Sequence, residues 1–366
     1  MAATPGSQVH QIPKMSLIFD ASDFEDLFNS SDYNTIIPSA DTAPCSDPWH
    51  LNKNLVVVVY CLVFFLSLVG NSLVVFVICY NRLKRSSTDV YLLHLAIADL
   101  LFAVTLPFWA VYRATEWVFG IAMCKAISGL QEVNFYSGIL LLACISIDRY
   151  LAIVRATEAA MQKRHLVKFI CLGIWIVSIL LSMPILIFRT DFKTPRNGRV
   201  CYENLGSDDT DRWRIILRIS RHIFGFFLPL LVMLFCYGTT IKTLCQNKNN
   251  QKTRAMKVIF AVVIAFLFCW LPYNITFFID SLMRSQIIDE TCQRRAEVET
   301  AISVTEMFGF MHSCINPILY AFIGQKFRNS FLRILANHGM VSKTFLSKYG
   351  RSSSNMSTSG NTSTTM

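Results

Sequence analysis

Seven stretches of the chain are apolar and long enough to cross a lipid bilayer. They lie at about 54–80, 90–113, 124–154, 167–188, 215–245, 254–283 and 296–323. Because the hydrocarbon core offers no water to the backbone N–H and C=O groups, each stretch must be helical. Charged residues make up only 16% of the chain, against about 25% in soluble domains. The sequence therefore predicts an all-α membrane protein, a bundle of seven transmembrane helices.

Basic residues mark one side of this bundle. They gather after the first span at Arg82, Lys84 and Arg85, after the third span, around the fifth and sixth spans, and in the tail. Lys and Arg concentrate in cytoplasmic loops, so these segments face the cytoplasm. The odd number of spans then places the N-terminus outside, as in a multi-pass protein of the plasma membrane. Since a membrane orientation accounts for the net charge of +10, no nucleic-acid partner is predicted.

The two ends of the chain are polar. Residues 1–53 form an extracellular arm with seven acidic residues against two lysines, a composition that predicts disorder. Asn29 begins an Asn-Ser-Ser glycosylation sequon on the extracellular side. After the transmembrane domain at 54–323, residues 324–335 suit a short amphipathic eighth helix. Residues 336–366 form a cytoplasmic tail rich in Ser and Thr.

Four of the twelve cysteines lie in polar segments on the extracellular side, which is oxidising. They are Cys45, Cys124, Cys201 and Cys292, and three pairings are open to them. We expect the bridges Cys124–Cys201 and Cys45–Cys292. The other eight lie in or beside apolar stretches and are interpreted as small buried side chains. No CxxC pair occurs, so no zinc site is predicted.

Short motifs occur in every one of the seven spans. They are Gly70-Asn71, Leu95-Ala96-Ile97-Ala98-Asp99, Asp148-Arg149-Tyr150, Trp175, Pro229 with Tyr237, Cys269-Trp270-Leu271-Pro272 and Asn316-Pro317-Ile318-Leu319-Tyr320. One such motif alone is a weak signal. All of them together, in this order and in these spans, resemble the rhodopsin-like G-protein-coupled receptors. The resemblance implies a receptor that passes an extracellular signal to a heterotrimeric G protein.

Longer stretches narrow the resemblance. Thr105-Leu106-Pro107-Phe108-Trp109, Trp117-Val118-Phe119-Gly120, Asp148-Arg149-Tyr150-Leu151-Ala152-Ile153-Val154 and the extra Cys45/Cys292 pair look like chemokine receptors. Glu132-Val133-Asn134-Phe135-Tyr136-Ser137-Gly138, Met233-Leu234-Phe235-Cys236-Tyr237-Gly238 and Phe322-Ile323-Gly324-Gln325-Lys326-Phe327-Arg328 look like the interleukin-8 receptors. This resemblance implies a receptor for CXC chemokines that bear a Glu-Leu-Arg triplet. It also implies an inhibitory-class G protein, calcium release and neutrophil chemotaxis.

The same resemblance implies a conformational switch in the cytoplasmic half of the bundle. Arg149 would be held by Asp148 at rest and turn toward the G protein when the sixth span moves outward. Trp270 and Pro272 would form the hinge of that span. The residues that would rearrange with it are Tyr150, Tyr237, Asn316, Pro317 and Tyr320. Lys252 stands where many relatives carry an acid, so no ion pair from the sixth span to Arg149 is expected.

Asp99 is a carboxylate at the middle of a span, where a charge is costly and usually functional. In the receptors that it resembles, this position holds sodium or a proton, and Asn134 and Ser313 could supply further oxygens. The chain departs from that pattern at Gly138, where many relatives have Ser, and at His312, where many have Asn. The alternative is a hydrated, hydrogen-bonded carboxylate. No other cofactor is expected.

The extracellular charges indicate a basic, secreted protein ligand. The acidic arm would attract it at long range, through Asp20, Asp23, Glu25, Asp26 and Tyr33. Tyr33 stands next to Asp32, which suits sulfation, although an ordinary flexible tyrosine is the alternative. Deeper residues would meet both signs of charge on the ligand, and some of them would be rim charges only. They are Asp280, Glu297 and Glu306 for a ligand Arg, and Arg214, Arg218, Arg284, Arg294 and Arg295 for a ligand Glu.

Hydroxyl side chains crowd the end of the tail. They are Ser352, Ser353, Ser354, Ser357, Thr358, Ser359, Thr362, Ser363, Thr364 and Thr365. Phosphorylation by receptor kinases would add about −1.5 to −2 charges per site and suit a basic arrestin surface; a flexible linker is the alternative. The final residues, ending at Met366, resemble a PDZ-binding C-terminus.

Other protein classes fit the sequence less well. A non-signalling decoy receptor of the same fold is the main alternative, but the Asp148-Arg149-Tyr150 motif is intact. A retinal protein needs a lysine in the last span, and 296–323 contains none. The chain shows no repeated halves of the kind found in many transporters. No nucleophile–base set suggests an enzyme.

Overall fold

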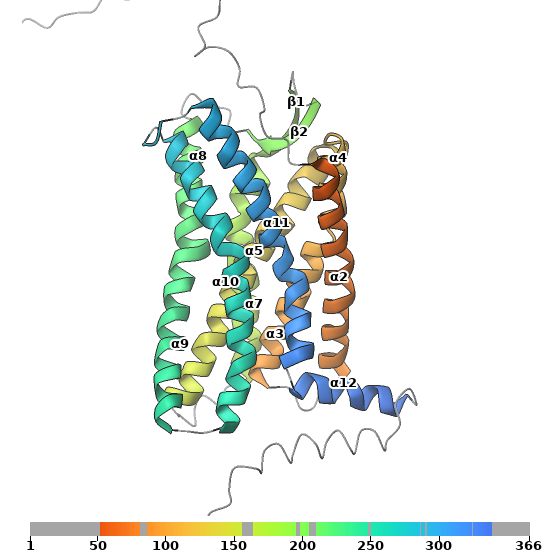
Figure 1. Ribbon diagram of the computed structural model, residues 1–366, viewed down its shortest axis with the longest axis vertical. Helices are drawn as coiled ribbons and strands as arrows, with labels where there is room; N and C mark the ends of the chain where they lie inside the picture. The colour runs from red at the N-terminus through yellow and green to blue at the C-terminus, as the bar shows by residue number, and fades with distance from the viewer. Residues whose placement is uncertain are drawn as a thin grey trace, which may run out of the picture. The chain divides into compact units, whose positions relative to one another are not determined.

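The computed structural model describes residues 52–80, 86–155, 164–194, 198–204, 210–247, 250–285, 287–289, 291–323 and 325–338. Long helices run side by side in one bundle (Figure 1). They are α2 (Lys53–Tyr80), α3 (Ser87–Ala103), α4 (Leu106–Ala114), α5 (Gly120–Tyr150), α7 (Arg164–Phe188), α8 (Thr210–His222), α9 (Leu228–Asn247), α10 (Asn250–Arg284) and α11 (Cys292–Ile323). The short α12 (Gln325–Asn337) lies across one end, against α2 and α11. The predicted bundle with its eighth helix is confirmed.

Six helical segments within the described residues are long and apolar enough to cross a membrane. They are Lys53–Tyr80, Ser87–Ala114, Gly120–Arg155, Leu166–Phe188, Trp213–Gln246 and Phe260–Arg284. The seventh predicted span is α11, a helix of 32 residues that packs against α10, α2 and α3. It carries Glu297, Glu299 and Glu306, which makes it more polar than the other six. This span therefore brings carboxylates into the bundle.

Two of the predicted spans are interrupted rather than continuous. Between α3 and α4 the chain turns at Val104 and Thr105, where the Thr105 hydroxyl donates to the Phe102 carbonyl at 2.7 Å. Pro107 follows in the first turn of α4, where its missing N–H costs nothing. Between α8 and α9 the π-helix η3 (Ile223–Phe227) precedes Pro229. A π-turn re-pairs backbone groups that a proline leaves without an intrahelical bond.

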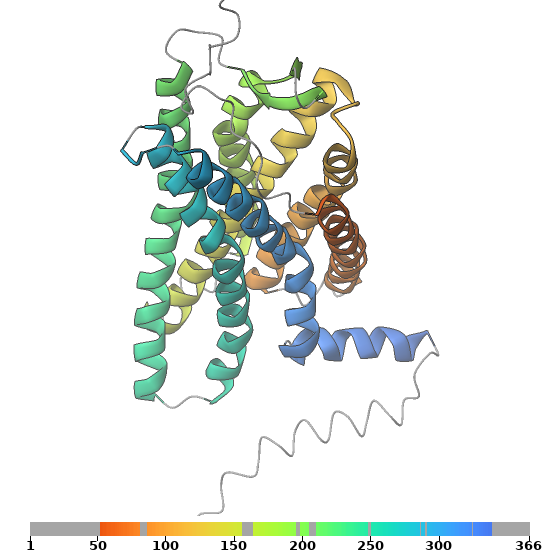
Figure 2. The ribbon, with the colours of Figure 1, turned by 45° about the horizontal axis from the view of Figure 1, so that its top comes forward.

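A two-stranded antiparallel hairpin lies at the end of the bundle opposite α12 (Figures 1 and 2). It consists of β1 (Arg189–Thr194) and β2 (Gly198–Glu203), with Asp191 opposite Cys201. A disulfide joins Cys201 to Cys124 near the start of α5, which confirms that predicted bridge. The Trp117 backbone N–H also donates to the Arg199 carbonyl at 2.9 Å. The disulfide and this hydrogen bond both fix the hairpin to the bundle.

The bundle is apolar on both its inside and its outside. Phe135, Phe266 and Trp270 are buried at its centre, whereas other large apolar side chains face outward, among them Phe169, which is 70% exposed. A water-soluble protein rarely exposes apolar surface on this scale. The outward-facing apolar side chains therefore suit a lipid environment, as the composition predicts.

We expect Gly70→Ala to lower the melting temperature of the purified protein. A Cβ atom at Gly70 would lie 2.8 Å from Cβ and 2.9 Å from Cγ of Pro317, and overpacking of this kind costs about 1–3 kcal/mol. The control is Gly173→Ala in α7, where a Cβ would meet nothing within 4 Å, and alanine should leave the melting temperature equal or higher. Equal melting temperatures for the two variants would contradict close packing of α2 on α11.

Candidate functional site

A cluster of charges lies between α8 and α10, near the end of the bundle that carries the hairpin. The Arg218 guanidinium forms an ion pair with Asp280 Oδ2, and Arg284 Nε donates to the same oxygen at 3.0 Å. The Arg218 guanidinium also lies 4.5 Å from the centre of the Phe277 ring. Both members of the Arg218–Asp280 pair are about nine-tenths buried. Two arginines on one carboxylate leave this cluster with a positive charge.

A second buried ion pair joins α8 to α5. Arg221 Nε lies 2.6 Å from Glu132 Oε1. The Arg221 guanidinium lies 4.2 Å from the centre of the Phe135 ring and 5.7 Å from that of Tyr273. Its Nη1 atom is buried and has no hydrogen-bond partner among the described residues. This donor is therefore available to a ligand acceptor.

A third ion pair connects α4 with α11. Arg113 Nη2 lies 2.9 Å from Glu306 Oε2, and the Tyr60 hydroxyl of α2 donates to the same oxygen at 3.3 Å. These three pairs join α8 to α5 and α10, and α4 to α11, by charge. They also place both signs of charge inside the same end of the bundle. A ligand with both an acidic and a basic group could exchange partners with them.

Aromatic rings continue from the charged pairs to the centre of the bundle. Phe135, which lies under Arg221, contacts Trp270 with the ring centres 5.1 Å apart. Trp270 also contacts Tyr273 at 5.8 Å and His312 at 5.2 Å. Pro272 lies inside α10 two residues after Trp270. A shift of Arg221 would therefore reach Trp270 through a single ring.

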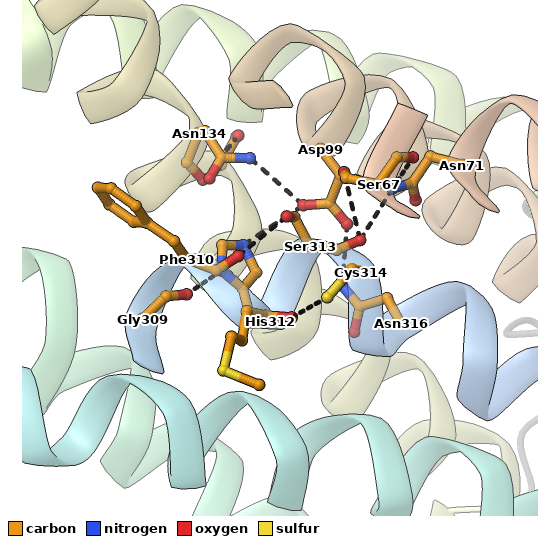
Figure 3. A network of polar contacts seen from close by, with 12 residues as sticks. Ser67, Asn71, Asp99, Asn134, Gly309, Phe310, His312, Ser313, Cys314 and Asn316 are labelled. Carbon is orange, nitrogen blue, oxygen red and sulfur yellow. Dashed lines mark hydrogen bonds and ion pairs between the residues drawn. The ribbon is translucent and has the colours of Figure 1, made fainter. Parts of the chain in front are cut away.

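Asp99 lies at the centre of a buried polar network (Figure 3). Asn316 Nδ2 donates to its Oδ2 at 2.9 Å, and Asn134 Nδ2 donates to its Oδ1 at 3.4 Å. His312 Nε2 also lies 3.4 Å from Oδ1. The Ser313 hydroxyl donates to the Phe310 carbonyl instead. The groups that face the carboxylate are therefore nitrogen atoms, which do not suit a hard cation that prefers oxygen ligands.

The Asp148-Arg149-Tyr150 motif forms the last residues of α5, before the π-helix η2 (Leu151–Arg155). Arg149 pairs with Asp148, with Nε of the arginine 3.1 Å from Oδ2. The Tyr150 ring lies 5.8 Å from that of Phe235 in α9. Nearby on α9, the buried Tyr237 hydroxyl has no hydrogen-bond partner among the described residues. It is a donor that a rearranged bundle could use.

Comparison with known proteins agrees with this geometry. The family described as "7 transmembrane receptor (rhodopsin family)" matches residues 70–320. The C-X-C chemokine receptor type 2 of Oryctolagus cuniculus is 57% identical over 351 residues, which cover 95% of this chain and 98% of the relative. This chain belongs to the CXC chemokine receptors.

Two further relatives give the same result for this receptor. The type 1 receptor of Oryctolagus cuniculus is 62% identical over 299 residues, covering 82% of this chain and 84% of the relative. The human type 2 receptor is 56% identical over 344 residues, covering 93% of this chain and 95% of the relative. The receptor is therefore a multi-pass protein of the plasma membrane and belongs to a non-enzymatic family.

The ligand residues predicted for this receptor are paired inside the protein. Arg218, Asp280 and Arg284 form one cluster, and Glu306 is held by Arg113. The remaining predicted residues lie nearer the rim: Arg214 is half-buried on α8, Arg294 donates to the Asp289 carbonyl, Arg295 pairs with Glu299, and Glu297 accepts from Gln293. A ligand must therefore displace internal partners at the buried sites, which the sequence did not indicate.

Three charged residues of this site were not predicted from the sequence as ligand-binding residues. Glu132 and Arg221 pair with each other, and Arg113 is the partner of Glu306. Their common signal is a charged side chain inside or at the end of an apolar span, where such residues are rare and functional. That signal could have identified them as candidate functional residues, as it did for Asp99. Which charge pairs with which depends on the helix packing.

The remaining predicted residues lie wholly or partly outside the described part of the chain. The side chain of Tyr320 in α11 is one, and Cys45 is another. Cys292 is disulfide-bonded, but its predicted bridge to Cys45 stays a prediction. The others are Asp20, Asp23, Glu25, Asp26, Asn29, Tyr33 and the tail hydroxyls Ser352, Ser353, Ser354, Ser357, Thr358, Ser359, Thr362, Ser363, Thr364 and Thr365.

Proposed function

We propose that this receptor binds CXC chemokines bearing a Glu-Leu-Arg triplet and activates an inhibitory-class heterotrimeric G protein. One observation carries the proposal: the buried pairs Arg218–Asp280 and Arg221–Glu132 place charges of both signs at one end of the bundle, and Arg221 contacts the Phe135 ring, which reaches Trp270. The likeness to type 1 and type 2 CXC chemokine receptors supports the choice of ligand class. Calcium release and leukocyte chemotaxis would follow from such coupling.

The charges of a Glu-Leu-Arg triplet match the two parts of the site. The ligand Glu would bind the positive cluster of Arg218 and Arg284, or the free Nη1 of Arg221. The ligand Arg would bind Asp280 or Glu306. A ligand charge that replaces a partner of the same sign leaves the buried charges compensated, which avoids the cost of an unpaired buried ion. Exchange of partners at Arg218 and Asp280 would then release α8 from α10.

The proposed signal ends at the cytoplasmic side. Release of the ion pairs would shift the balance between two packings of the helices, with Trp270 and Pro272 at the hinge. Arg149 would then leave Asp148 and meet the G protein. Receptor kinases would phosphorylate the tail and arrestin would bind it, ending the signal, while a PDZ protein would bind the C-terminus. This arrangement requires the N-terminal arm to face outward.

The ligand assignment can be tested with matched chemokines. Labelled interleukin-8-like chemokine and a variant with the triplet replaced by alanines would be bound to cells that express the receptor. We expect the intact ligand to bind and to release calcium, and the alanine variant to lose most of both. Release of calcium should disappear when inhibitory-class G proteins are inactivated by pertussis toxin. Equal responses to both ligands would refute the assigned ligand class.

We expect neutralisation of Asp20, Asp23, Glu25 and Asp26 to slow chemokine association. The arm would act at long range, and attraction between exposed charges is screened over about 8 Å at physiological ionic strength. The association rate should therefore fall at low salt, and the difference from the unmodified receptor should shrink at high salt. Surface plasmon resonance at several salt concentrations measures this. An unchanged association rate at low salt would exclude electrostatic steering by the arm.

A further inference from the structure

The ring of His312 is fixed in front of Asp99 by contacts on several sides. Its Nδ1 atom is bonded to the Gly309 carbonyl, and its Nε2 atom lies 3.4 Å from Asp99 Oδ1. The ring is 2% exposed and packs against the rings of Phe102, Phe266 and Trp270. Figure 3 shows the imidazole between the Gly309 carbonyl and the Asp99 carboxylate. His312 is therefore well placed to act as a partner of Asp99.

The contacts of this ring determine which of its atoms faces Asp99. A backbone carbonyl only accepts, so Nδ1 donates to the Gly309 carbonyl and Nε2 is turned toward the carboxylate. The Nε2 atom lies 3.4 Å from Oδ1, so the buried ring occupies that side of the carboxylate. A sodium ion at this place would have to displace the ring.

The remaining neighbours of Asp99 offer few oxygen ligands to a sodium ion. Asn316 and Asn134 direct amide N–H groups at the two carboxylate oxygens. Gly138, on the same helix as Asn134, supplies no hydroxyl group. A Cβ at Gly138 would meet only Phe266 at 3.7 Å and Leu95 at 4.0 Å, which is ordinary contact. The space for an oxygen ligand thus exists, but the side chain does not.

From this geometry we infer that the His312 ring occupies the place that a sodium ion would take beside Asp99. The receptor then has no sodium site at its centre, and sodium does not stabilise its resting state. Restoring oxygen ligands should create the site: Asn at 312 and Ser at 138 would supply two, and the buried Asn134 Oδ1, which has no hydrogen-bond partner among the described residues, would supply a third.

The test measures the thermal stability of the purified full-length receptor in sodium chloride and in N-methyl-D-glucamine chloride at equal ionic strength. A ligand that binds only the folded state raises the melting temperature with its concentration. We expect equal melting temperatures in the two salts for the unmodified receptor. The double variant Gly138→Ser/His312→Asn should show a saturable rise with sodium. This experiment uses no chemokine, so its result is independent of the proposed ligand.

Two outcomes would overturn the inference. A saturable rise with sodium in the unmodified receptor would show that the site binds the ion despite His312. A folded double variant whose melting temperature does not rise with sodium would show that His312 and Gly138 are not what excludes the ion. Because the double variant could fail to fold, ²³Na NMR on the unmodified receptor gives a second measurement. A sodium signal broadened by the receptor, and restored by competing amiloride, would also overturn the inference.

Discussion

Replacement of Arg149 by alanine is expected to abolish G-protein activation and to leave chemokine binding at the cell surface largely intact. Arg149 lies at the end of α5 and is paired with Asp148, far along the chain from the charged pairs of α8 and α10. The proposed contact of Arg149 with the G protein would form only in the active state, so its loss should change chemokine binding to the resting receptor little. Nucleotide exchange on the G protein and binding of labelled chemokine, measured on the same membranes, separate the two effects.

Asp148→Asn is the matched variant for this experiment. It weakens the ion pair but keeps Arg149, so basal activation should rise rather than fall. Cell-surface amounts of all variants must be measured, since loss of folding would lower both readouts together. Normal coupling by Arg149→Ala would contradict the assigned role of this residue.

Asp280→Ala is expected to speed chemokine dissociation and to weaken activation by about 30-fold or more. Removing one member of a buried, hydrogen-bonded charge pair costs about 2–5 kcal/mol in binding, chiefly through the dissociation rate. Asp280 is the acceptor for both Arg218 and Arg284, so its loss leaves two arginines facing each other. Dissociation kinetics and calcium release on the same cells measure the effect.

An exposed ion pair provides the control for Asp280. Arg295 and Glu299 lie one helical turn apart at the start of α11, with side chains 37% and 54% exposed. Pairs of this kind contribute about 0–1 kcal/mol, so Arg295→Ala should change dissociation only slightly. The charge exchange Arg218→Asp/Asp280→Arg should restore folding without restoring the ligand response. Full signalling by this charge-exchange variant would show that the ligand does not recognise the charges at positions 218 and 280.

The architecture could be predicted from the sequence because the bilayer permits few solutions. Apolar stretches such as 54–80 must be helices, and their order and charge bias fix the topology. The interruptions at Thr105 and at Ile223–Phe227 were not predicted. They depend on how a backbone re-pairs its hydrogen bonds near Pro107 and Pro229, which periodicity does not show. The hairpin of β1 and β2 was not predicted either.

The functional residues could be named from the sequence more readily than the partners with which they pair. A charge in an apolar span, such as Asp99 or Glu306, is visible in the sequence because it is costly there. Its partner is not visible, because Arg113 and Glu306 are brought together by packing of helices far apart in the chain. The role of His312 was hidden likewise: a histidine in place of asparagine is a departure in sequence, but only the geometry shows it facing Asp99.

Signalling rather than mere capture of a chemokine is the central property proposed for this receptor. Purified receptor in lipid nanodiscs, with a purified inhibitory-class G protein and a Glu-Leu-Arg chemokine, provides the most direct measurement: the rate of guanine-nucleotide exchange with and without the ligand. We predict that the chemokine accelerates exchange on the unmodified receptor and not on Arg149→Ala. Tight binding of the chemokine to the unmodified receptor with no acceleration would contradict signalling and establish a decoy receptor of the same fold.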